Sequence, residues 1–433
     1  MDTVTIINIT LAALFFVCYA YQLFYIIVPF FAKDKPHGEI KKHRFAVLIA
    51  ARNEEKVIGQ LINSITNQTY DRDLVTVFVV ADNCDDATAA VAADGGAVVY
   101  KRFDKNLIGK GYALNFLLRK IAADYPEGAF DGYFVFDADN VLDENYIEEM
   151  NKTFSDGFEV ITSYRNSKNF GTNWITAGYA LWFLRESRYL NHSRMLLGTS
   201  CAVSGTGFMF SQAIINEYGG WNFFLLTEDI EFTVHNICSG KKIGFCKDAV
   251  LFDEQPETFG QSWTQRLRWA RGYLQVFGKY GAKLAGGAIK GSFSCFDMTM
   301  AIMPAAVISV IGIIANLYAI IFDVAVKNTE TMFSNPAFTL FYSMYLTVFI
   351  VGAITTASEW KSIYAPTWKK LLYTFTFPLF MLTYIPIMFA AMMHKRITWK
   401  PIEHTRSEDI SDIRGDETSE ISKNQANRSK VLT

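Results

Sequence analysis

Acidic residues form a closely spaced pair in the first half of this 433-residue chain. Asp137 and Asp139 follow the apolar residues 134–136 and have one residue between them. Two carboxylates at the end of a buried strand suit Mg²⁺ or Mn²⁺, because these hard cations bind carboxylate oxygens together with phosphate oxygens. A solvated acidic loop is the alternative for an isolated Asp-X-Asp sequence. The apolar strand that precedes the pair favours a metal site.

A second acidic pair, Glu228 and Asp229, lies in the sequence TEDIEFT. A carboxylate held close to a hydroxyl group can remove its proton, which is general-base catalysis. The same residues also suit the first turn of a helix that has Thr227 as its cap. The two interpretations are compatible, since a capped helix would hold the base in place.

Polar and aromatic residues recur at helical spacing in the sequence QRLRW. Gln265, Arg268 and Trp269 stand at positions i, i+3 and i+4, so a helix would place them on one face. The planar guanidinium of Arg268 suits phosphate oxygens, and Trp269 offers a flat ring to a ligand. The alternative is an amphipathic helix on a membrane surface, with Trp263 and Trp269 as interfacial anchors. A further amphipathic segment is expected over residues 174–197.

Two smaller motifs complete the candidate site. Lys110 begins a predicted helix in KGYALN and can reach a diphosphate, although a surface lysine at a helix start is an equal alternative. In SGTGFMFS, Gly205 and Gly207 follow Ser204 and Thr206. Glycine permits close approach of the backbone to a ligand, and a simple tight turn is the other interpretation.

Strands and helices that alternate between residues 44 and 257 would position these groups. RFAVLIAARNE, LVTVFVVADNCDD and GYFVFDADN are apolar runs that end in polar residues, and helical spacing separates them. This alternation predicts an α/β fold with a parallel sheet, in which ligands bind beyond the carboxyl ends of the strands. The polar groups there suit a nucleotide site. The strand-end residues are Arg52, Asn53, Glu54, Asp82, Asp85, Asp86, Asp137 and Asp139.

Four long runs contain no Asp, Glu, Lys or Arg: residues 3–32, 298–322, 337–358 and 371–393. A helix of about 20 apolar residues crosses the hydrocarbon core of a bilayer. Helices buried in a large soluble core are the alternative. A signal peptide is not favoured for the first run, because no basic segment precedes it. We therefore predict a multi-pass protein of the cell membrane.

Basic residues set the expected orientation. Lys33, Lys35, Lys41, Lys42 and Arg44 follow the first run, which places the N-terminus outside and the next domain in the cytoplasm. Positive charge flanks the last run on both sides, and the topology of the C-terminal part stays open.

The charge balance argues against nucleic acid as a partner. The formal net charge is −2 and the pI is about 6.3, without the basic surface that nucleic-acid binding requires. The six cysteines have no CxxC spacing. Residues 397–433 are polar, and we expect a disordered tail there.

Taken in order, AARNEE, VVADNCDD, KGYALN, FDADN, SGTGFMFS, TEDIEFT and QRLRW resemble the motifs of the processive membrane glycosyltransferases of family 2. That family includes the synthases of cellulose, chitin, hyaluronan and poly-N-acetylglucosamine. The resemblance covers roughly residues 40 to 395. It implies a GT-A fold, which is a Rossmann-like nucleotide-sugar domain, inserted between transmembrane helices and followed by amphipathic interface helices.

The expected domains follow from this resemblance. They are a transmembrane helix at 1–32, a cytoplasmic GT-A domain at 33–257, interface helices with QxxRW at 258–297, transmembrane helices at 298–396 and the polar tail at 397–433.

The resemblance also implies roles for individual residues. Asp229, beside Glu228, would be the catalytic base, and Asp137 and Asp139 would hold Mg²⁺ or Mn²⁺, with Asp139 the more direct ligand. The expected substrate-binding residues are Ala50, Arg52, Glu54, Asp82, Lys110, Asp137, Ser204, Gly205, Gln265, Arg268 and Trp269.

The implied activity is processive, inverting β-glycosyl transfer from a UDP-sugar, with translocation of the growing polysaccharide across the bilayer. UDP-glucose and a β-glucan with 1,4 and also 1,3 linkages are favoured, and UDP-N-acetylglucosamine with chitin or poly-N-acetylglucosamine is the alternative. A non-processive transferase with a lipid acceptor is a further alternative. A transporter with a nucleotide-sensing domain is disfavoured, because the apolar runs lack the polar groups of transporter sites.

Overall fold

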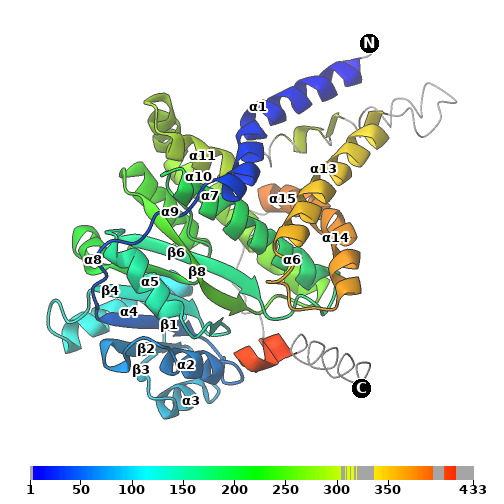
Figure 1. Ribbon diagram of the computed structural model, residues 1–433. Coiled ribbons are helices and arrows are strands. Elements are labelled where there is room, and N and C mark those ends of the chain that lie inside the picture. The colour runs from blue at the N-terminus through cyan, green and yellow to red at the C-terminus, as the bar shows by residue number, and fades with distance from the viewer. Residues whose placement is uncertain are drawn as a thin grey trace, which may run out of the picture.

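The computed structural model describes residues 3–303, scattered positions between 308 and 318, residues 336–393 and residues 404–415. Figure 1 shows an α/β part on one side and long helices from both ends of the chain on the other. The sheet has eight strands in the order β3-β2-β1-β4-β7-β6-β8-β5. The strands are β1 (Phe45–Ala51), β2 (Val75–Asp82), β3 (Val98–Arg102), β4 (Gly132–Asp137), β5 (Val141–Leu142), β6 (Val160–Ser167), β7 (Phe208–Ser211) and β8 (Ile243–Asp253).

The first four strands of this order, β3 to β4, are parallel, as the alternation predicts. β7 is antiparallel to both β4 and β6, and β5 is antiparallel to β8. A purely parallel sheet was therefore the wrong expectation for the second half of the domain, where the sheet is mixed. The parallel half still brings the carboxyl ends of β1, β2 and β4 to one edge.

Alternate residues of β1 serve two hydrophobic cores. Phe45, Val47 and Ile49 pack with α2 and α5, whereas Ala46 and Leu48 pack with α4 on the opposite face. Strands that are covered on both faces are apolar throughout, which explains the continuous apolar runs in the sequence. The helices of this part are α2 (Ile58–Thr66), η1 (Arg72–Leu74), α3 (Thr88–Asp94), α4 (Lys110–Asp124), α5 (Tyr146–Ser155), α8 (Gln212–Tyr218) and α9 (Glu228–Cys238).

A second group of helices joins the sheet to the apolar helices. It comprises α6 (Trp174–Arg185), the π-helix η2 (Glu186–Asn191), α7 (His192–Leu196), α10 (Phe259–Ile289) and α11 (Phe293–Ile302). α10 begins with a capping box in which Thr258 and Gln261 satisfy each other's backbone amides. α6 is buried on almost every side rather than amphipathic, and it packs against β6 and α14.

Three stretches of described helix are long and apolar enough to cross a membrane: Ile6–Phe31, Phe341–Ser358 and Thr367–Met393. They coincide with three of the four predicted runs. The remaining run, 298–322, lies partly outside the described residues, and its first residues belong to α11. The helices concerned are α1 (Thr3–Phe31), α13 (Pro336–Ser358), α14 (Thr367–Leu382) and α15 (Tyr384–Met393).

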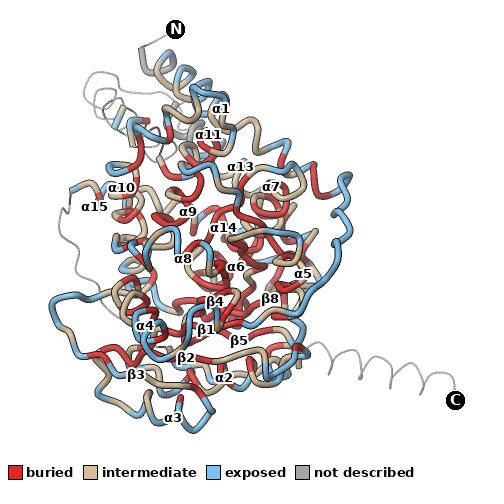
Figure 2. The backbone as a smooth tube through the Cα atoms, turned by 90° about the vertical axis from the view of Figure 1, so that its left-hand side faces the viewer, coloured by how far each residue is buried: buried red, intermediate tan, exposed pale blue. Residues whose placement is uncertain are grey.

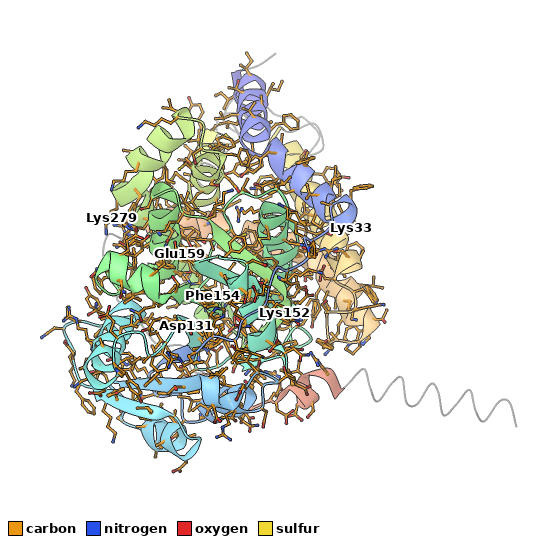
Figure 3. All side chains as sticks on the ribbon, turned by 60° about the vertical axis from the view of Figure 1, so that its left-hand side comes forward. Lys33, Asp131, Lys152, Phe154, Glu159 and Lys279 are labelled. Carbon is orange, nitrogen blue, oxygen red and sulfur yellow. The ribbon has the colours of Figure 1, made fainter. Side chains whose placement is uncertain are left out.

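The surface of α1 is apolar where it leaves the α/β part. Phe16 is 63% exposed and Val17 is 73% exposed, as expected for side chains that face lipid. Figure 2 shows the same contrast between exposed positions on α1 and the buried strands. Lys33 follows the end of α1 that is nearer to the α/β part (Figure 3). The basic segment after the helix therefore lies on the same side as the α/β part.

A buried ion pair ties α1 to the helices that follow the site. Arg194 Nε lies 2.7 Å from Asp297 Oδ2, and both side chains are 2% exposed. The hydroxyl groups of Tyr21 and Tyr25 on α1 donate to the same carboxylate, at 2.8 and 3.0 Å. A buried charge is tolerated only when it is paired in this way, so this cluster fixes α1 against α7 and α11.

Residues 404–415 pack against the domain, which differs from the disorder expected for the tail. Residues 410–415 are helical, and Ile413 is buried against Val141 and Phe252 (Figure 1, red). Arg406 forms an ion pair with Glu257 at 2.6 Å. Apolar side chains and paired charges thus hold this short stretch of a largely polar segment.

Candidate active site

A cavity of about 530 Å³ begins at the carboxyl ends of β1, β2 and β4 and continues between the apolar helices. Every residue predicted to act in catalysis or to bind substrate or metal lines it, whereas the strand-end residues Asn53, Asp85 and Asp86 do not. The predicted residues that line the cavity are Ala50, Arg52, Glu54, Asp82, Lys110, Asp137, Asp139, Ser204, Gly205, Glu228, Asp229, Gln265, Arg268 and Trp269. The fold therefore brings these residues together, while the chemical role of each stays a prediction.

The turns after β1 and β2 are locked to each other. Asn53 and Asn83 both adopt left-handed backbone conformations, with φ of 57° and 54°. The Asn53 amide donates to Asp85 Oδ1 at 2.6 Å, and the Asp85 backbone amide donates to Asn53 Oδ1 at 3.1 Å. Asparagine tolerates this conformation better than most residues, which explains its use at both turns.

Asp82 is held by a partner that sequence reasoning missed. Arg102, at the end of the neighbouring strand β3, donates to Asp82 Oδ1 at 2.6 Å. Burial raises the pKa of Asp82, and Arg102 opposes that rise. The two basic residues that end β3, Lys101 and Arg102, were the available signal, but the pairing depends on the register of β3 against β2.

Lys110 connects two sides of the cavity. Its Nζ lies 2.6 Å from Asp137 Oδ1 and donates to the Gly205 carbonyl oxygen at 2.8 Å. Burial lowers the pKa of Lys110, but Asp137 and Glu228 outweigh it, and the net pKa is raised. Lys110 is therefore a cation between the strand-end acids and the loop that carries Gly205.

Asp139 is buried and faces positive charge as well. It accepts a hydrogen bond from the Glu254 backbone amide at 3.2 Å, and its Oδ2 lies 3.9 Å from His404 Nε2. His404 Nδ1 is 3.1 Å from Glu54. Burial lowers the pKa of His404, yet Asp139 and Glu54 raise it overall to about 10. Two carboxylates from separate elements thus attract one imidazolium, which comes from the segment expected to be disordered.

The acidic edge fits a divalent cation that completes its coordination with ligand oxygens. Within the described ranges, no three His, Cys, Asp or Glu side chains are placed to enclose a metal ion by themselves. Asp137 and Asp139 nevertheless offer hard oxygen donors, and Lys110 and His404 already bring positive charge to them. A cation such as Mg²⁺ keeps few protein carboxylates and takes the rest of its oxygens from phosphate and water.

α9 begins at Glu228, as the sequence predicted, and its first turn points into the cavity. Thr227 occupies the cap position without a side-chain cap bond. Burial raises the pKa of both Glu228 and Asp229. The backbone amides of Ile230 and Gly205 oppose the rise at Asp229. Asp229 is therefore a desolvated carboxylate beside the loop that carries Gly205, which suits a general base.

The loop 204–207 is fixed by close packing. Gly207 has φ of +66°, and a Cβ atom there would lie 1.8 Å from the Leu251 side chain, so only glycine fits. The Thr206 hydroxyl accepts a hydrogen bond from the Asp137 amide at 2.9 Å. Arg165, which sequence reasoning missed, donates to the Ser204 carbonyl oxygen at 2.8 Å.

The helical face of QRLRW lies on α10. Arg268 donates to the Leu226 carbonyl oxygen at 3.0 Å, just before the acidic pair of α9. Trp269 packs edge-on against Tyr179 and Phe183, with ring centroids 5.8 and 6.3 Å apart. Arg266, on another face, is buried and donates to Thr383, so it does not face lipid headgroups.

Beyond Trp269 the cavity lining becomes aliphatic. This part lies among α1, α13, α14 and α15 and the residues after α11. Its lining residues include Phe15, Met303, Val310, Met344, Val348, Met381, Leu382, Ile385 and Met388. A polar strand-end site and an apolar region between helices thus share one cavity.

The fold and the site together define an α/β enzyme with an acidic strand-end cavity beside apolar helices. The chain belongs to the family described as glycosyltransferase like family 2, whose model matches residues 43–272. The predicted family and the GT-A fold are confirmed, and the chain is a glycosyltransferase.

Relatives of the chain carry names of two kinds. A beta-monoglucosyldiacylglycerol synthase of Trichormus variabilis is 25% identical over 383 residues, which cover 84% of this chain and 76% of that protein. A poly-beta-1,6-N-acetyl-D-glucosamine synthase of Staphylococcus epidermidis is 25% identical over 270 residues, covering 57% of this chain and 60% of that protein. The chain spans about half the length of several other curated relatives that it matches.

A solved structure shares the fold. The mannosyltransferase PcManGT of Pyrobaculum calidifontis, in complex with GDP-Man and Mn²⁺, has a TM-score of 0.56 and 16% identity. The similarity covers 89% of this chain and 99% of that one. At this identity the comparison supports the architecture alone.

Proposed function

We propose that this protein transfers a sugar from a UDP-sugar to an acceptor hydroxyl with inversion, and that it repeats the transfer to build a β-linked polysaccharide. The observation that carries the proposal is the single cavity, which joins the acidic sheet edge to the space between the apolar helices. A growing chain would leave the site along this continuous space, between the apolar helices. The catalytic domain would then face the cytoplasm, where UDP-sugars are made.

Asp229 takes the acceptor proton in this proposal. The acceptor oxygen forms a bond to C1 of the donor sugar, the bond between C1 and the diphosphate oxygen breaks, and the proton passes to Asp229. One base and one displacement give inversion at C1. Burial keeps Asp229 away from bulk water and raises its pKa, which strengthens it as a base relative to a surface aspartate.

Positive groups hold the diphosphate as its charge grows. Lys110 and Arg268 both line the cavity close to the acidic pair of α9. Asp137 and Asp139 would hold Mg²⁺ or Mn²⁺, which supplies charge stabilisation for the leaving diphosphate. Ala50, Arg52, Glu54 and Asp82 would surround the nucleoside end.

The acceptor sugar would lie between the loop 204–207 and α10. Trp269 presents an aromatic ring to the cavity, and Gln265 Oε1 is buried without a hydrogen-bond partner among the described residues. An unpartnered buried amide oxygen is costly unless a ligand supplies the donor, so Gln265 suits a sugar hydroxyl.

A donor screen tests the proposal. Purified protein is incubated with UDP-glucose, UDP-N-acetylglucosamine and other UDP-sugars in the presence of Mg²⁺ or Mn²⁺. We expect UDP release and an insoluble β-linked polymer, with UDP-glucose favoured and UDP-N-acetylglucosamine the next candidate. Absence of UDP release with every sugar would contradict the proposal.

A lipid acceptor is the second candidate, favoured by the aliphatic lining beyond Trp269. Sugar hydroxyls would find few partners there, and each unmade hydrogen bond costs about 1–3 kcal/mol, whereas an acyl chain would fit. The name of the Trichormus variabilis relative points the same way. In the screen, a single-sugar product that extracts into organic solvent only when diacylglycerol is added would establish this candidate instead of the polymer.

A further inference from the structure

Glu186 is an acidic residue on the acceptor side of the cavity that has no role in the transfer step described above. Glu186 lines the cavity together with Ser204, Asp229 and Tyr273. It is the first residue of the π-helix η2, directly after α6. A π-helix is rare, and it occurs frequently at functional sites because the wider turn displaces a side chain from the regular helical position.

The Glu186 carboxylate has very few partners. Ser204 Oγ donates to its Oε2 at 3.3 Å, and this is the sole hydrogen bond to the carboxylate from any described residue. Among the described residues, no lysine, arginine or histidine nitrogen lies within 4.0 Å of the Glu186 carboxylate. A carboxylate offers about four acceptor positions, so most of its capacity is unused.

Two buried carboxylates elsewhere in the described residues are fully engaged. Glu231 accepts from the backbone amides of Phe224 and Leu225 and pairs with Lys279. Asp297 accepts from Arg194 and from two tyrosines. Glu186, which is partly exposed and lines the cavity, has fewer partners than either of these two acids. A cavity-lining acid with most of its acceptor capacity unused can accept hydrogen bonds from the hydroxyl groups of a ligand.

Tyr273 places a second polar group in the same area. It lies on α10 one turn beyond Trp269, and its environment carries the negative charge of both Glu186 and Asp229. Its hydroxyl makes no hydrogen bond to any described side chain or backbone group. The cavity next to Asp229 is thus bordered by an acceptor, Glu186, and by a hydroxyl, Tyr273, which can donate or accept.

We propose that Glu186, with Ser204 and Tyr273, forms a subsite that binds the hydroxyl groups of the acceptor sugar next to Asp229. The carboxylate accepts hydrogen bonds from adjacent ring hydroxyls and so orients the sugar whose free hydroxyl is to be deprotonated. The inference rests on the proposed function and narrows it. The acceptor ends in a sugar ring, and Glu186 determines which acceptor is recognised.

A purely structural role for Glu186 makes a different prediction. Arg165, Arg185 and Arg194 all contribute positive charge at Glu186, so the acid would balance that charge. Loss of a structural acid would lower stability and reduce all activities together. Loss of an acceptor-binding acid would affect transfer to the acceptor and spare hydrolysis of the donor by water.

The test uses Glu186→Gln and Glu186→Ala in the full chain, with UDP-glucose and a soluble β-1,4-glucan oligosaccharide as the added acceptor. We expect Glu186→Ala to raise the acceptor KM about tenfold or more, the effect of losing hydrogen bonds to a charged group. Donor hydrolysis without acceptor should change less than about threefold. Glu186→Gln should lie between, since its amide oxygen keeps part of the accepting capacity.

Glu359→Gln is the matched control. Glu359 is a buried acid that accepts from Tyr164 and lies 3.5 Å from Arg188, and it does not line the cavity. The Glu359→Gln substitution should lower thermal stability without changing the acceptor KM.

The outcomes distinguish a failure of the proposed subsite from a failure of the proposed function. An unchanged acceptor KM in Glu186→Ala, or equal losses of hydrolysis and transfer in both Glu186 variants, would overturn the subsite while the proposed function stands. Wild-type protein that makes no product from any UDP-sugar would overturn the proposed function, and the subsite with it.

Discussion

Lys110 Nζ lies 2.6 Å from Asp137 Oδ1, and the same amino group donates to the Gly205 carbonyl oxygen. One cation therefore links the sheet edge that would hold the donor to the loop that would hold the acceptor. We predict that Lys110→Met weakens UDP-sugar binding roughly tenfold or more, because a charged hydrogen bond is lost and Asp137 is left unpaired. Calorimetric titration in detergent measures this. Lys120→Met, on the exposed side of the same helix, should bind normally, and equal affinities for the two variants would refute the role of Lys110.

Asp229→Asn tests the catalytic base. The amide keeps the shape of the side chain but cannot accept the proton, so transfer should fall by about 10²-fold or more. Binding of the UDP-sugar should persist, because Lys110 and Arg268 are unchanged. Asp94→Asn, at the exposed end of α3, is the control. Near-normal product yield from Asp229→Asn would remove Asp229 from this role.

The pH dependence follows from the raised pKa values of Glu228 and Asp229. A base works only when it is deprotonated, so the rate should rise with pH, and the acidic limb of kcat/KM should lie above the ordinary carboxyl pKa of about 4. Removal of the adjacent charge in Glu228→Gln should move the limb to lower pH. A limb at or below the ordinary carboxyl value in wild-type enzyme would contradict this.

Metal dependence is tested by Asp139→Asn and by chelation. EDTA should abolish most activity of the wild-type enzyme, and added Mn²⁺ should restore it. Asp139→Asn should lose a comparable share of activity, since a strand-end acid contributes more to the site than to packing. Thermal unfolding should confirm that the variant remains folded. Full turnover in EDTA would exclude the metal.

Trp269→Ala should separate elongation from hydrolysis. The ring borders the cavity and rests on Tyr179 and Phe183. Its removal takes away a surface for the acceptor sugar, so polymer yield should fall more than UDP release. Trp263→Ala is the comparison, because Trp263 packs with Ile387 at the apolar helices and does not line the cavity. A constant ratio of polymer to UDP in Trp269→Ala would indicate a membrane anchor only.

Much of the candidate site could be predicted from local patterns. Asp82 and Asp137 each end an apolar strand, and parallel strands must end at the same edge of a sheet. Gln265, Arg268 and Trp269 share a helical face because of their spacing alone. The order of the motifs added the expected functional roles, and the family comparison confirms the class of enzyme.

Other features depend on contacts between distant segments. β7 lies antiparallel between β4 and β6, a placement that no local pattern in FMFS specifies. His404 reaches Glu54 across 350 positions of sequence, from a segment whose polar composition predicted disorder. Its order comes from a few specific pairs and one buried isoleucine, which composition does not register.

The sequence by itself determined the strands, the apolar helices and the acids that meet at the sheet edge, because periodicity and strand direction are local properties of the chain. Only the tertiary structure decided that the cavity continues between the apolar helices, that Lys110 bridges Asp137 and Gly205, and that Glu186 borders the cavity almost without partners. Those facts depend on how side chains from separate elements fill or leave space, and close packing sets that only when the whole chain has folded.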